Sequence, residues 1–205
     1  ARSLDLCTWE VMAPILDERI ASTWDEKAVW SPNVYVEDGV YYLYFTGVTN
    51  EFAQSILLAT STNPADPESW EMQPMVFQPS HPGTIWDETR WADCRDPMVM
   101  KVGDVYHLYY TALDEQGGIV GLATAGSPAG EWTDWGNIIP PNPGSIPESP
   151  TMYMHDHFYY LFYHYSYQPE TYRIGASPAG PWVGEAVLAP GWAHEVWDGQ
   201  DGSTY

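Results

Sequence analysis

Two carboxylic side chains far apart in the chain stand in similar surroundings: Asp96 lies in an Arg-Asp-Pro tripeptide and Glu148 in a Glu-Ser-Pro tripeptide. Two such groups held close together can divide acid–base work, because repulsion between like charges keeps one of them protonated. Each residue also has a structural alternative. An Asp before a strand commonly bonds its own backbone, and a Glu is commonly a solvated surface residue. The chemistry therefore depends on whether the fold brings the two tripeptides together.

Other residue types that often carry chemistry have structural explanations here. The sequence His155-Asp156-His157 falls in a predicted hairpin turn, so turn formation rather than metal binding explains it. Cys7 and Cys94 lie far apart and match no zinc, redox or haem spacing. We expect both cysteines to be structural, and we expect no metal ligand set and no redox or nucleotide cofactor.

An internal repeat supplies the elements that position Asp96 and Glu148. Three segments each begin after a proline and consist of a predicted strand, a tight turn and a second strand rich in Tyr, which is typical of a β-hairpin. The segments are Val34 to Phe45 after Pro32, Val99 to Tyr110 after Pro97, and Met152 to Tyr163 after Pro150. Asp96 and Glu148 therefore precede equivalent first strands, each with its proline at the strand's start.

Two further strands follow each hairpin. The predicted third strands are Ile56 to Ser61, Ile119 to Ala125 and Arg173 to Ser177, and the predicted fourth strands are Trp70 to Phe77, Trp132 to Ile139 and Trp182 to Leu188. Four short antiparallel strands per period of about 50 to 65 residues are typical of a β-propeller blade. The Trp that opens each fourth strand recurs, so we expect it to pack between blades.

The sequence thus predicts an all-β protein: one β-propeller domain over residues 1–205, with about three complete blades and two flanking strands. Trp9 to Leu16 is predicted to be a fourth strand with no blade before it, and Ala193 to Trp197 a first strand with little after it. Because propellers typically close with four to eight blades, we expect a portion of a larger propeller, or one closed by another copy. Open blade edges would then join a homo-oligomer. A β-sandwich of similar hairpins is the alternative.

Composition excludes two classes of partner. The 28 acidic and 7 basic residues give a net charge of -21, whereas binding the phosphates of a nucleic acid requires a basic surface. No apolar run approaches the roughly 18 residues of a membrane span, so no membrane partner is expected. A secreted or periplasmic location is favoured.

The proline-bearing segments resemble those of the five-bladed β-propeller glycoside hydrolases, a superfamily that includes the arabinanase and xylosidase family and the invertase and levanase family. In those enzymes the first strand of each blade faces a central funnel. One blade carries an Asp-Pro motif whose Asp is the base or nucleophile. A later blade carries an Asp-Pro motif that tunes the charge of the site, and a third carries the Glu that acts as acid. The Arg-Asp-Pro tripeptide at Asp96 resembles the second motif and the Glu-Ser-Pro tripeptide at Glu148 the third. The resemblance implies a glycoside hydrolase with Glu148 as general acid and Asp96 as its charge partner.

This sequence departs from the family pattern at the first catalytic Asp-Pro. Ser31 occupies that position in the invertase alignment, whereas in the arabinanase alignment the carboxylate would precede residue 1. Asp25, Asp87 and Asp93 are the remaining acidic candidates. We therefore expect this chain alone to be catalytically incomplete, with weak or absent turnover. A non-catalytic carbohydrate-binding propeller is the alternative function, and a protein-interaction propeller is disfavoured by the two convergent carboxylates.

Arabinose-, xylose- or fructose-containing oligosaccharides and polysaccharides are the substrates that the resemblance implies. Candidate substrate-binding residues lie near the first strands, where aromatic faces could stack on sugars and polar groups could bond hydroxyls. They are Arg95, Trp30, Ser31, Asn33, Trp91, His194 and Glu195. His194 resembles a histidine that in some members sits near a central calcium site, so the resemblance allows a central calcium although no cofactor is required.

Overall fold

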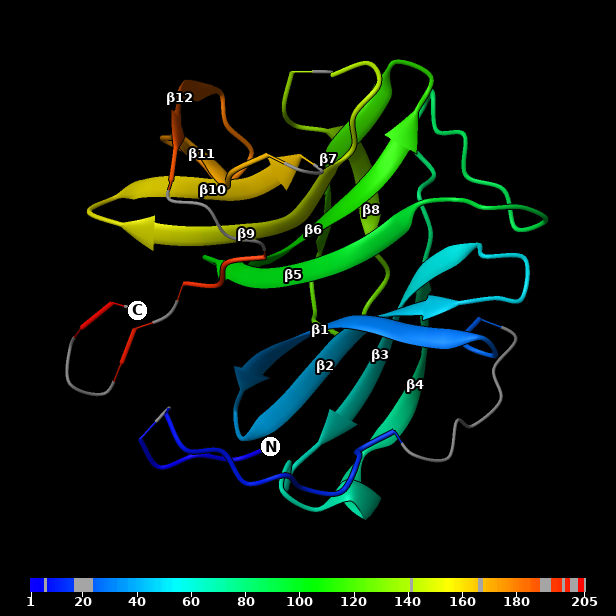
Figure 1. Cartoon of the computed structure of the whole chain (residues 1–205), viewed down its shortest axis with the longest axis vertical. Helices are drawn as coiled ribbons and strands as arrows, with labels where there is room; N and C mark the ends of the chain where they lie inside the picture. Colours follow the sequence, from blue (N-terminus) through cyan, green and yellow to red (C-terminus); the bar gives the residue numbers. More distant parts are fainter. Residues whose placement is uncertain are drawn as a thin grey trace.

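Three four-stranded antiparallel sheets follow one another along the chain (Figure 1). The computed structural model describes residues 1–5, 7–16, 24–140, 142–165, 168–188, 193–196, 198–199 and 203–204. The strands are β1 (Ala28–Glu37), β2 (Val40–Val48), β3 (Gln54–Ser61), β4 (Glu71–Phe77), β5 (Cys94–Val102), β6 (Val105–Asp114), β7 (Gly117–Ala125), β8 (Thr133–Asn137), β9 (Pro147–His155), β10 (Phe158–Tyr165), β11 (Thr171–Gly175) and β12 (Trp182–Val187). Among these described residues the only helix is the 3-10 turn Pro67–Ser69, and none is long or apolar enough to cross a membrane.

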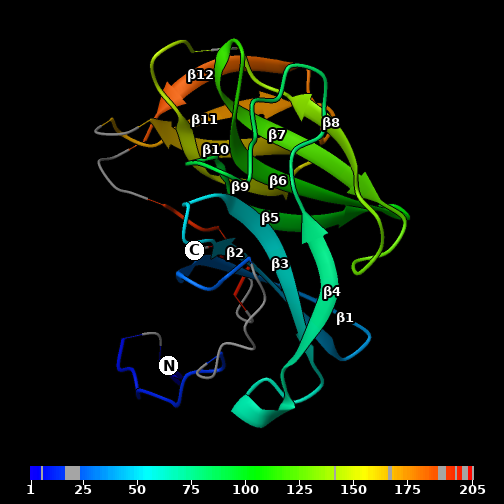
Figure 2. The ribbon, with the colours of Figure 1, turned by 90° about the vertical axis from the view of Figure 1, so that its right-hand side faces the viewer.

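The arrangement of the sheets is that of consecutive propeller blades. Within each sheet the strands pair in chain order, so the first and fourth strands form the two edges. β5 packs against β1 on one side and against β9 on the other. The second sheet accordingly lies between the first and the third in both views (Figures 1 and 2). The predicted all-β propeller portion with three four-stranded units is confirmed.

Each first strand contains a β-bulge at its proline, and the residue before that proline has a left-handed backbone. The φ angle is 46° at Ser31, 55° at Asp96 and 54° at Ser149. The ladder register shifts at the same places. Proline cannot donate a ladder hydrogen bond and is tolerated at bulges. The expectation that the proline begins the strand is therefore wrong, since β1, β5 and β9 all begin before it.

Neither of the two predicted flanking strands is formed by the residues that the structure describes. The described part of the chain from Trp9 to Leu16 lies outside the three sheets, and its contact of strand type is a single bridge between Arg2 and Glu10. Residues 193–196 also lie outside the sheets, and Trp197 falls outside the described residues. A strand needs a neighbour to satisfy its backbone groups, and neither segment pairs with a described strand. Ala193 nevertheless has a φ of 54°, like the residues before the three prolines.

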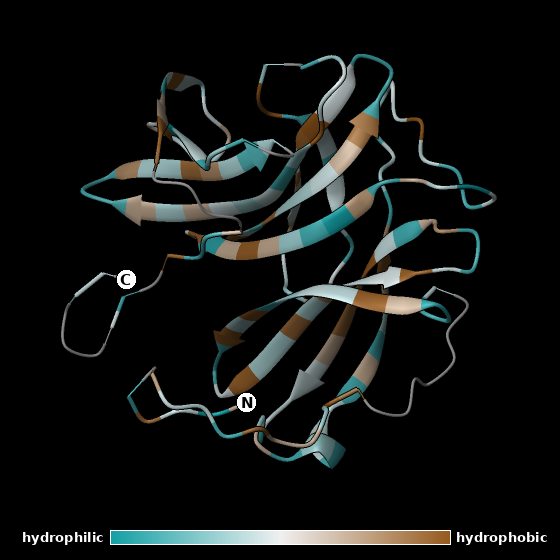
Figure 3. Cartoon of the chain, in the orientation of Figure 1, coloured by the Kyte–Doolittle hydropathy of each residue, from teal (hydrophilic) through white to brown (hydrophobic). Residues whose placement is uncertain are grey.

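Apolar side chains fill the space between neighbouring sheets. Strands alternate hydrophobic and hydrophilic residues (Figure 3), as expected when one face of a strand is buried. One cluster joins the first and second sheets, and Trp132 packs there edge-on to Tyr44, with 6.3 Å between ring centroids. A second cluster joins the second and third sheets and includes Trp182. Packing between blades is thus confirmed for these two Trp residues. Trp70 instead packs against a cluster of residues that all belong to the first sheet.

The long connection from β4 to β5 is fixed to the second sheet by Asp134. The backbone N–H groups of Ser80 and His81 donate to Asp134 Oδ2 over 2.7 and 2.9 Å. The hydroxyl of Tyr110 donates to Asp134 Oδ1 over 2.5 Å. These bonds stabilise a loop that ends immediately before the Arg-Asp-Pro motif of β5.

Candidate active site

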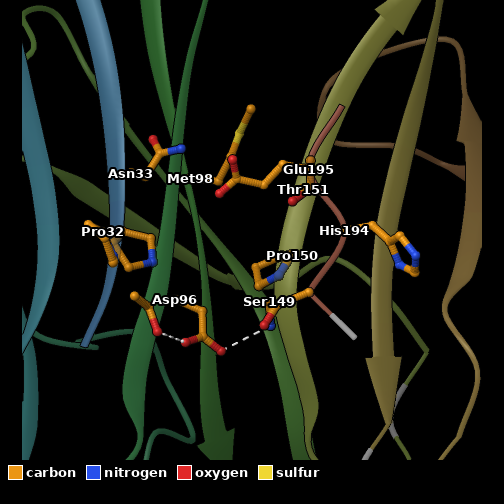
Figure 4. Close-up of a pocket in the computed structure, with 12 residues that line it drawn as sticks. Pro32, Asn33, Asp96, Met98, Ser149, Pro150, Thr151, His194 and Glu195 are labelled. Carbon is orange, nitrogen blue, oxygen red and sulfur yellow. Dashed lines mark hydrogen bonds between the residues drawn. The ribbon is translucent and has the colours of Figure 1, made fainter. Parts of the chain in front are cut away.

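The first strands of the three sheets and residues 193–195 converge on a pocket of about 240 Å³ (Figure 4). Its lining is drawn from equivalent positions of the repeats: Ser31, Pro32, Asn33, Asp96, Pro97, Met98, Ser149, Pro150, Thr151, Ala193, His194 and Glu195. In Figure 4, Asp96 and Ser149 lie at one end of the pocket, whereas Asn33, Met98 and Glu195 lie at the other. Of the predicted site residues, Ser31, Asn33, Asp96, His194 and Glu195 therefore meet here, whereas Glu148 and Arg95 lie outside the lining.

Asp96 uses both carboxylate oxygens inside the protein. Ser31 Oγ donates to Oδ1 over 2.6 Å, and the backbone N–H of Ser149 donates to Oδ2 over 2.9 Å. Thr111 Oγ1 also donates to Oδ2, over 3.3 Å. These partners come from β1, β9 and β6, so Asp96 links the first strands of all three blades. The alternative of an Asp that only bonds its own backbone does not describe this residue.

Arg95 lies among three carboxylates. It donates through Nη1 to Asp93, through Nη2 to Glu148 Oε1 over 2.7 Å, and its Nε is 3.7 Å from Asp96 Oδ2. Burial opposes the charge on the guanidinium, but the attraction of Asp93, Asp96 and Glu148 prevails and raises the pKa of Arg95. A cation thus stands between Asp96 and Glu148 and offsets the repulsion that the sequence predicts between them.

Glu148 is the most open of the acids around Arg95, with 20% of its side chain exposed. Its Oε1 accepts from Arg95, and its Oε2 is 3.5 Å from His164 Nε2. His164 lies directly opposite Glu148 on the neighbouring strand β10. Glu148 is therefore held from two sides rather than solvated as a free surface residue, and it retains access to solvent.

Sequence reasoning missed His164, although the repeat carried a signal for it. Thr46, Thr111 and His164 occupy the same position of their second strands, opposite Trp30, Arg95 and Glu148. A His in place of Thr directly opposite the predicted acid marks the third blade as different. Burial lowers the pKa of His164.

Trp91 and Trp30 lie outside the lining of the pocket. Trp91 is 57% exposed and stacks on Phe52, with 5.4 Å between ring centroids and an angle of 20° between the rings. Its Nε1 donates to Asp93 Oδ1 over 3.3 Å, which connects it through Asp93 and Arg95 to Glu148. The stacked pair offers an exposed aromatic face of the type that binds sugar rings.

None of the three candidate bases lines the pocket. Asp93 is buried and bound to Arg95, and Asp25 is also buried. Asp87 accepts from Thr89 and pairs with Arg90 at 3.1 Å. The pocket geometry therefore identifies none of these three as the second carboxylate that glycoside hydrolysis requires.

The donor groups at the pocket do not fit a calcium ion. Calcium takes six to eight oxygen ligands, but both oxygens of Asp96 already accept hydrogen bonds, and Asn33 Oδ1 accepts from the Val99 N–H over 3.1 Å. His194 would offer only nitrogen. Across the part of the chain that the structure describes, no cluster of three or more His, Cys, Asp or Glu residues could hold a metal ion.

Glu170, which directly precedes β11, is fully buried beside two imidazoles. Its Oε2 is 3.4 Å from His194 Nδ1 and 3.8 Å from His164 Nδ1. Burial raises the pKa of Glu170. Because the folded protein then binds this proton more tightly than the unfolded chain, Glu170 contributes stability below the ordinary Glu pKa, and that contribution is lost as pH rises through the raised value.

Replacing Glu170 by Gln should therefore raise the thermal midpoint of the protein at about pH 7 to 8, where the buried carboxylate is costly. The difference between variant and wild type should shrink toward about pH 4, where both side chains are uncharged. Differential scanning calorimetry across this pH range measures it. A stabilisation that stays the same or grows as pH falls would contradict the assignment.

Comparisons with known proteins support the fold. Residues 1–92 match the sequence model of glycosyl hydrolases family 43. A comparison with curated proteins finds no match. A family 117 glycoside hydrolase from the marine bacterium Zobellia galactanivorans is 21% identical with a TM-score of 0.61, covering 79% of this chain and 55% of that one.

Two further solved structures are similar over a large part of this chain. Sucrose-6-phosphate hydrolase from Lactobacillus gasseri is 16% identical with a TM-score of 0.67, covering 89% of this chain and 41% of that one. Fructan 1-exohydrolase IIa from Cichorium intybus is 17% identical with a TM-score of 0.62, covering 77% and 32%. The chain thus spans about half or less of the length of these enzymes. The solved structures confirm the predicted fold, and the match to the family 43 model covers 92 of the 205 residues.

Proposed function

We propose that this chain is the acid-bearing part of a propeller glycoside hydrolase that acts on arabinose-, xylose- or fructose-containing oligosaccharides or polysaccharides. The observation that carries the proposal is the setting of Glu148: a partly exposed carboxyl at a first-strand start, held by Arg95 and His164. Glycoside hydrolysis needs such a group to protonate the leaving oxygen. The similarity to glycoside hydrolases in fold also supports the proposal that this chain takes part in glycoside hydrolysis.

In this mechanism Glu148 gives its proton to the glycosidic oxygen as the bond to the sugar breaks. Both carboxylate oxygens of Asp96 accept hydrogen bonds from the first strands of the other two blades. Its buried charge also helps to hold Arg95 in place. Trp91 and Phe52 bind a sugar face beside the network. A second carboxylate must act on the opposite side of the anomeric carbon, and no repeat position of this chain singles one out.

The test of the proposal is incubation of the chain with arabino-, xylo- and fructo-oligosaccharides, with binding and product release measured separately. One class should bind, with weak or absent product release because the second carboxylate is missing from the aligned positions. Failure to bind any of the three classes would contradict the proposal. Strong hydrolysis would instead show that the base lies within the chain, and substitution of Asp25, Asp87 and Asp93 would then identify it.

A non-catalytic carbohydrate-binding propeller is the second candidate. Ser31 favours it, because this residue occupies in β1 the bulge position that Asp96 holds in β5. A hydroxyl cannot serve as the carboxylate base or nucleophile. Under this alternative, sugar binding would be retained in Glu148 variants and no assembly containing the chain would release product.

We also propose that two copies of the chain associate through their end blades. The first sheet exposes apolar side chains along β1, where Val34 and Val36 are 50% and 49% exposed. The last sheet does the same on β12, where Val183 and Val187 are 65% and 64% exposed. Light scattering should report a dimer or higher oligomer, and substitution of Val34 and Val36 by Thr should weaken it. A stable monomer at micromolar concentration would contradict this proposal.

A further inference from the structure

His164 stands between two carboxyl groups, one on each ring nitrogen. Its Nε2 is 3.5 Å from Glu148 Oε2, and its Nδ1 is 3.8 Å from Glu170 Oε2. The imidazole is almost completely buried, and Glu170 is fully buried. Glutamate is rarely buried to this degree without a specific partner. The row Glu170, His164, Glu148 therefore runs from the interior to the partly open carboxyl proposed as the acid.

The protonation of His164 decides what it presents to Glu148. A neutral imidazole has one N–H donor and one acceptor nitrogen, and the group facing the first nitrogen selects the tautomer. Burial lowers the pKa of His164 and so favours the neutral ring. An oxygen of Glu170 on the Nδ1 side favours the proton on Nδ1. The acceptor lone pair of Nε2 then faces Glu148 Oε2.

We infer that Glu170 and His164 are positioning residues that orient the carboxyl of Glu148 for proton transfer, which deepens the role of Glu148 in the proposed function and rests on it. The two oxygens of Glu148 then have different tasks. Oε1 accepts from Arg95, and Oε2 faces the acceptor nitrogen of His164. The separations of 3.5 and 3.8 Å are longer than most hydrogen bonds, as is common before a ligand closes a site.

The other charged groups around His164 have opposing effects on its pKa. Glu148 and Asp96 favour the imidazolium, whereas His194 and Arg95 disfavour it. His194 also faces Glu170 from residues 193–196 and lies 3.4 Å from the same oxygen. The direct assignment of the His164 tautomer therefore tests the inference better than a pH profile alone.

The experiment is nitrogen NMR of the whole chain labelled with ¹⁵N-histidine, because the ring shifts distinguish the two tautomers and the imidazolium. His164→Gln removes and thereby assigns the His164 signals. Wild type near neutral pH should carry the proton on Nδ1. Glu170→Leu should shift the population to Nε2–H. Glu170→Gln keeps an oxygen acceptor in the same volume and should restore the Nδ1–H form.

Glu185→Gln is the matched control, because Glu185 is an exposed carboxylate of the same sheet that pairs with Arg173. It should leave the His164 signals unchanged. A wild-type His164 that is protonated on Nε2, or is an imidazolium at neutral pH, would overturn the inference. So would an Nδ1–H form that persists in Glu170→Leu. If that variant does not fold, the wild-type spectrum still tests the inference, because an Nε2–H form or an imidazolium would overturn it.

The same variants separate this inference from the proposed function. In any active form, Glu170→Leu should lower kcat on substrates with poor leaving groups by about tenfold to a hundredfold with little change in KM, and Glu170→Gln should restore most of it. If the His164 tautomer changes in Glu170→Leu but no form of the protein hydrolyses a sugar substrate, the proposed function is wrong and the inference stands. If hydrolysis requires Glu148 but the His164 tautomer is the same in Glu170→Leu and in wild type, the inference is wrong and the proposed function stands.

Discussion

Glu148→Gln should lower kcat on glycosides with poor leaving groups by about 10² to 10⁴-fold in any active form of the protein, because the amide cannot protonate the departing oxygen. The same variant should lose much less on activated aryl glycosides, whose leaving groups depart without a proton. The comparison of kcat on an oligosaccharide and on its nitrophenyl counterpart measures this difference.

The variant should also fold. The side-chain oxygen of the introduced glutamine can still accept from Arg95, and Glu148 is part of no apolar core cluster. Circular dichroism and thermal unfolding are the controls. Unchanged turnover of poor-leaving-group substrates, or an unfolded variant, would show that Glu148 has a structural role and that the acid lies elsewhere.

Arg95→Ala should be the most destabilising single change in the site, lowering the free energy of unfolding by about 3 to 5 kcal/mol. The guanidinium is only 11% exposed, and its removal leaves Asp93, Asp96 and Glu148 without their common cation. Urea unfolding of the variant and the wild type at neutral pH measures the difference.

Two variants give this measurement its controls. Arg95→Lys keeps the charge but cannot reach Asp93 and Glu148 together with one ammonium, so it should lie between wild type and Arg95→Ala. Arg90→Ala removes an exposed cation paired with Asp87 and should cost no more than about 1 kcal/mol. If Arg95→Ala lowered the free energy of unfolding as little as Arg90→Ala, the buried carboxylates around Arg95 would not need its positive charge for stability.

The repeat made the blades predictable, because each strand type recurs in order and four strands per unit leave few other folds. It also aligned the tripeptides at Asp96 and Glu148, and these meet around Arg95 in the structure. The bulges were not predictable in the same way. A residue before proline is normally biased toward extended backbone, and at Asp96 the left-handed conformation is stabilised by bonds from Ser31 and Ser149 on other strands.

The other features that the sequence did not predict depend on contacts between residues that are brought together only by the tertiary structure. Arg95 reaches Asp93 two residues before it and Glu148 in another blade, which no local pattern encodes. The segment from Trp9 to Leu16 has the composition of a strand, but a strand forms only where a neighbour supplies its hydrogen bonds. Phe52 gave no repeat signal, because it lies in a connection whose length differs between blades.

The central claim is that a carbohydrate binds beside Glu148 at the starts of the first strands. NMR of the indole N–H groups during titration with arabino-, xylo- and fructo-oligosaccharides tests it without requiring turnover. The signals of Trp91 and Trp30 should move with one sugar class, while those of Trp132 and Trp182, which pack between blades, should stay in place. Saturable shifts confined to Trp132 and Trp182, or no shift with any of the three classes, would contradict the account.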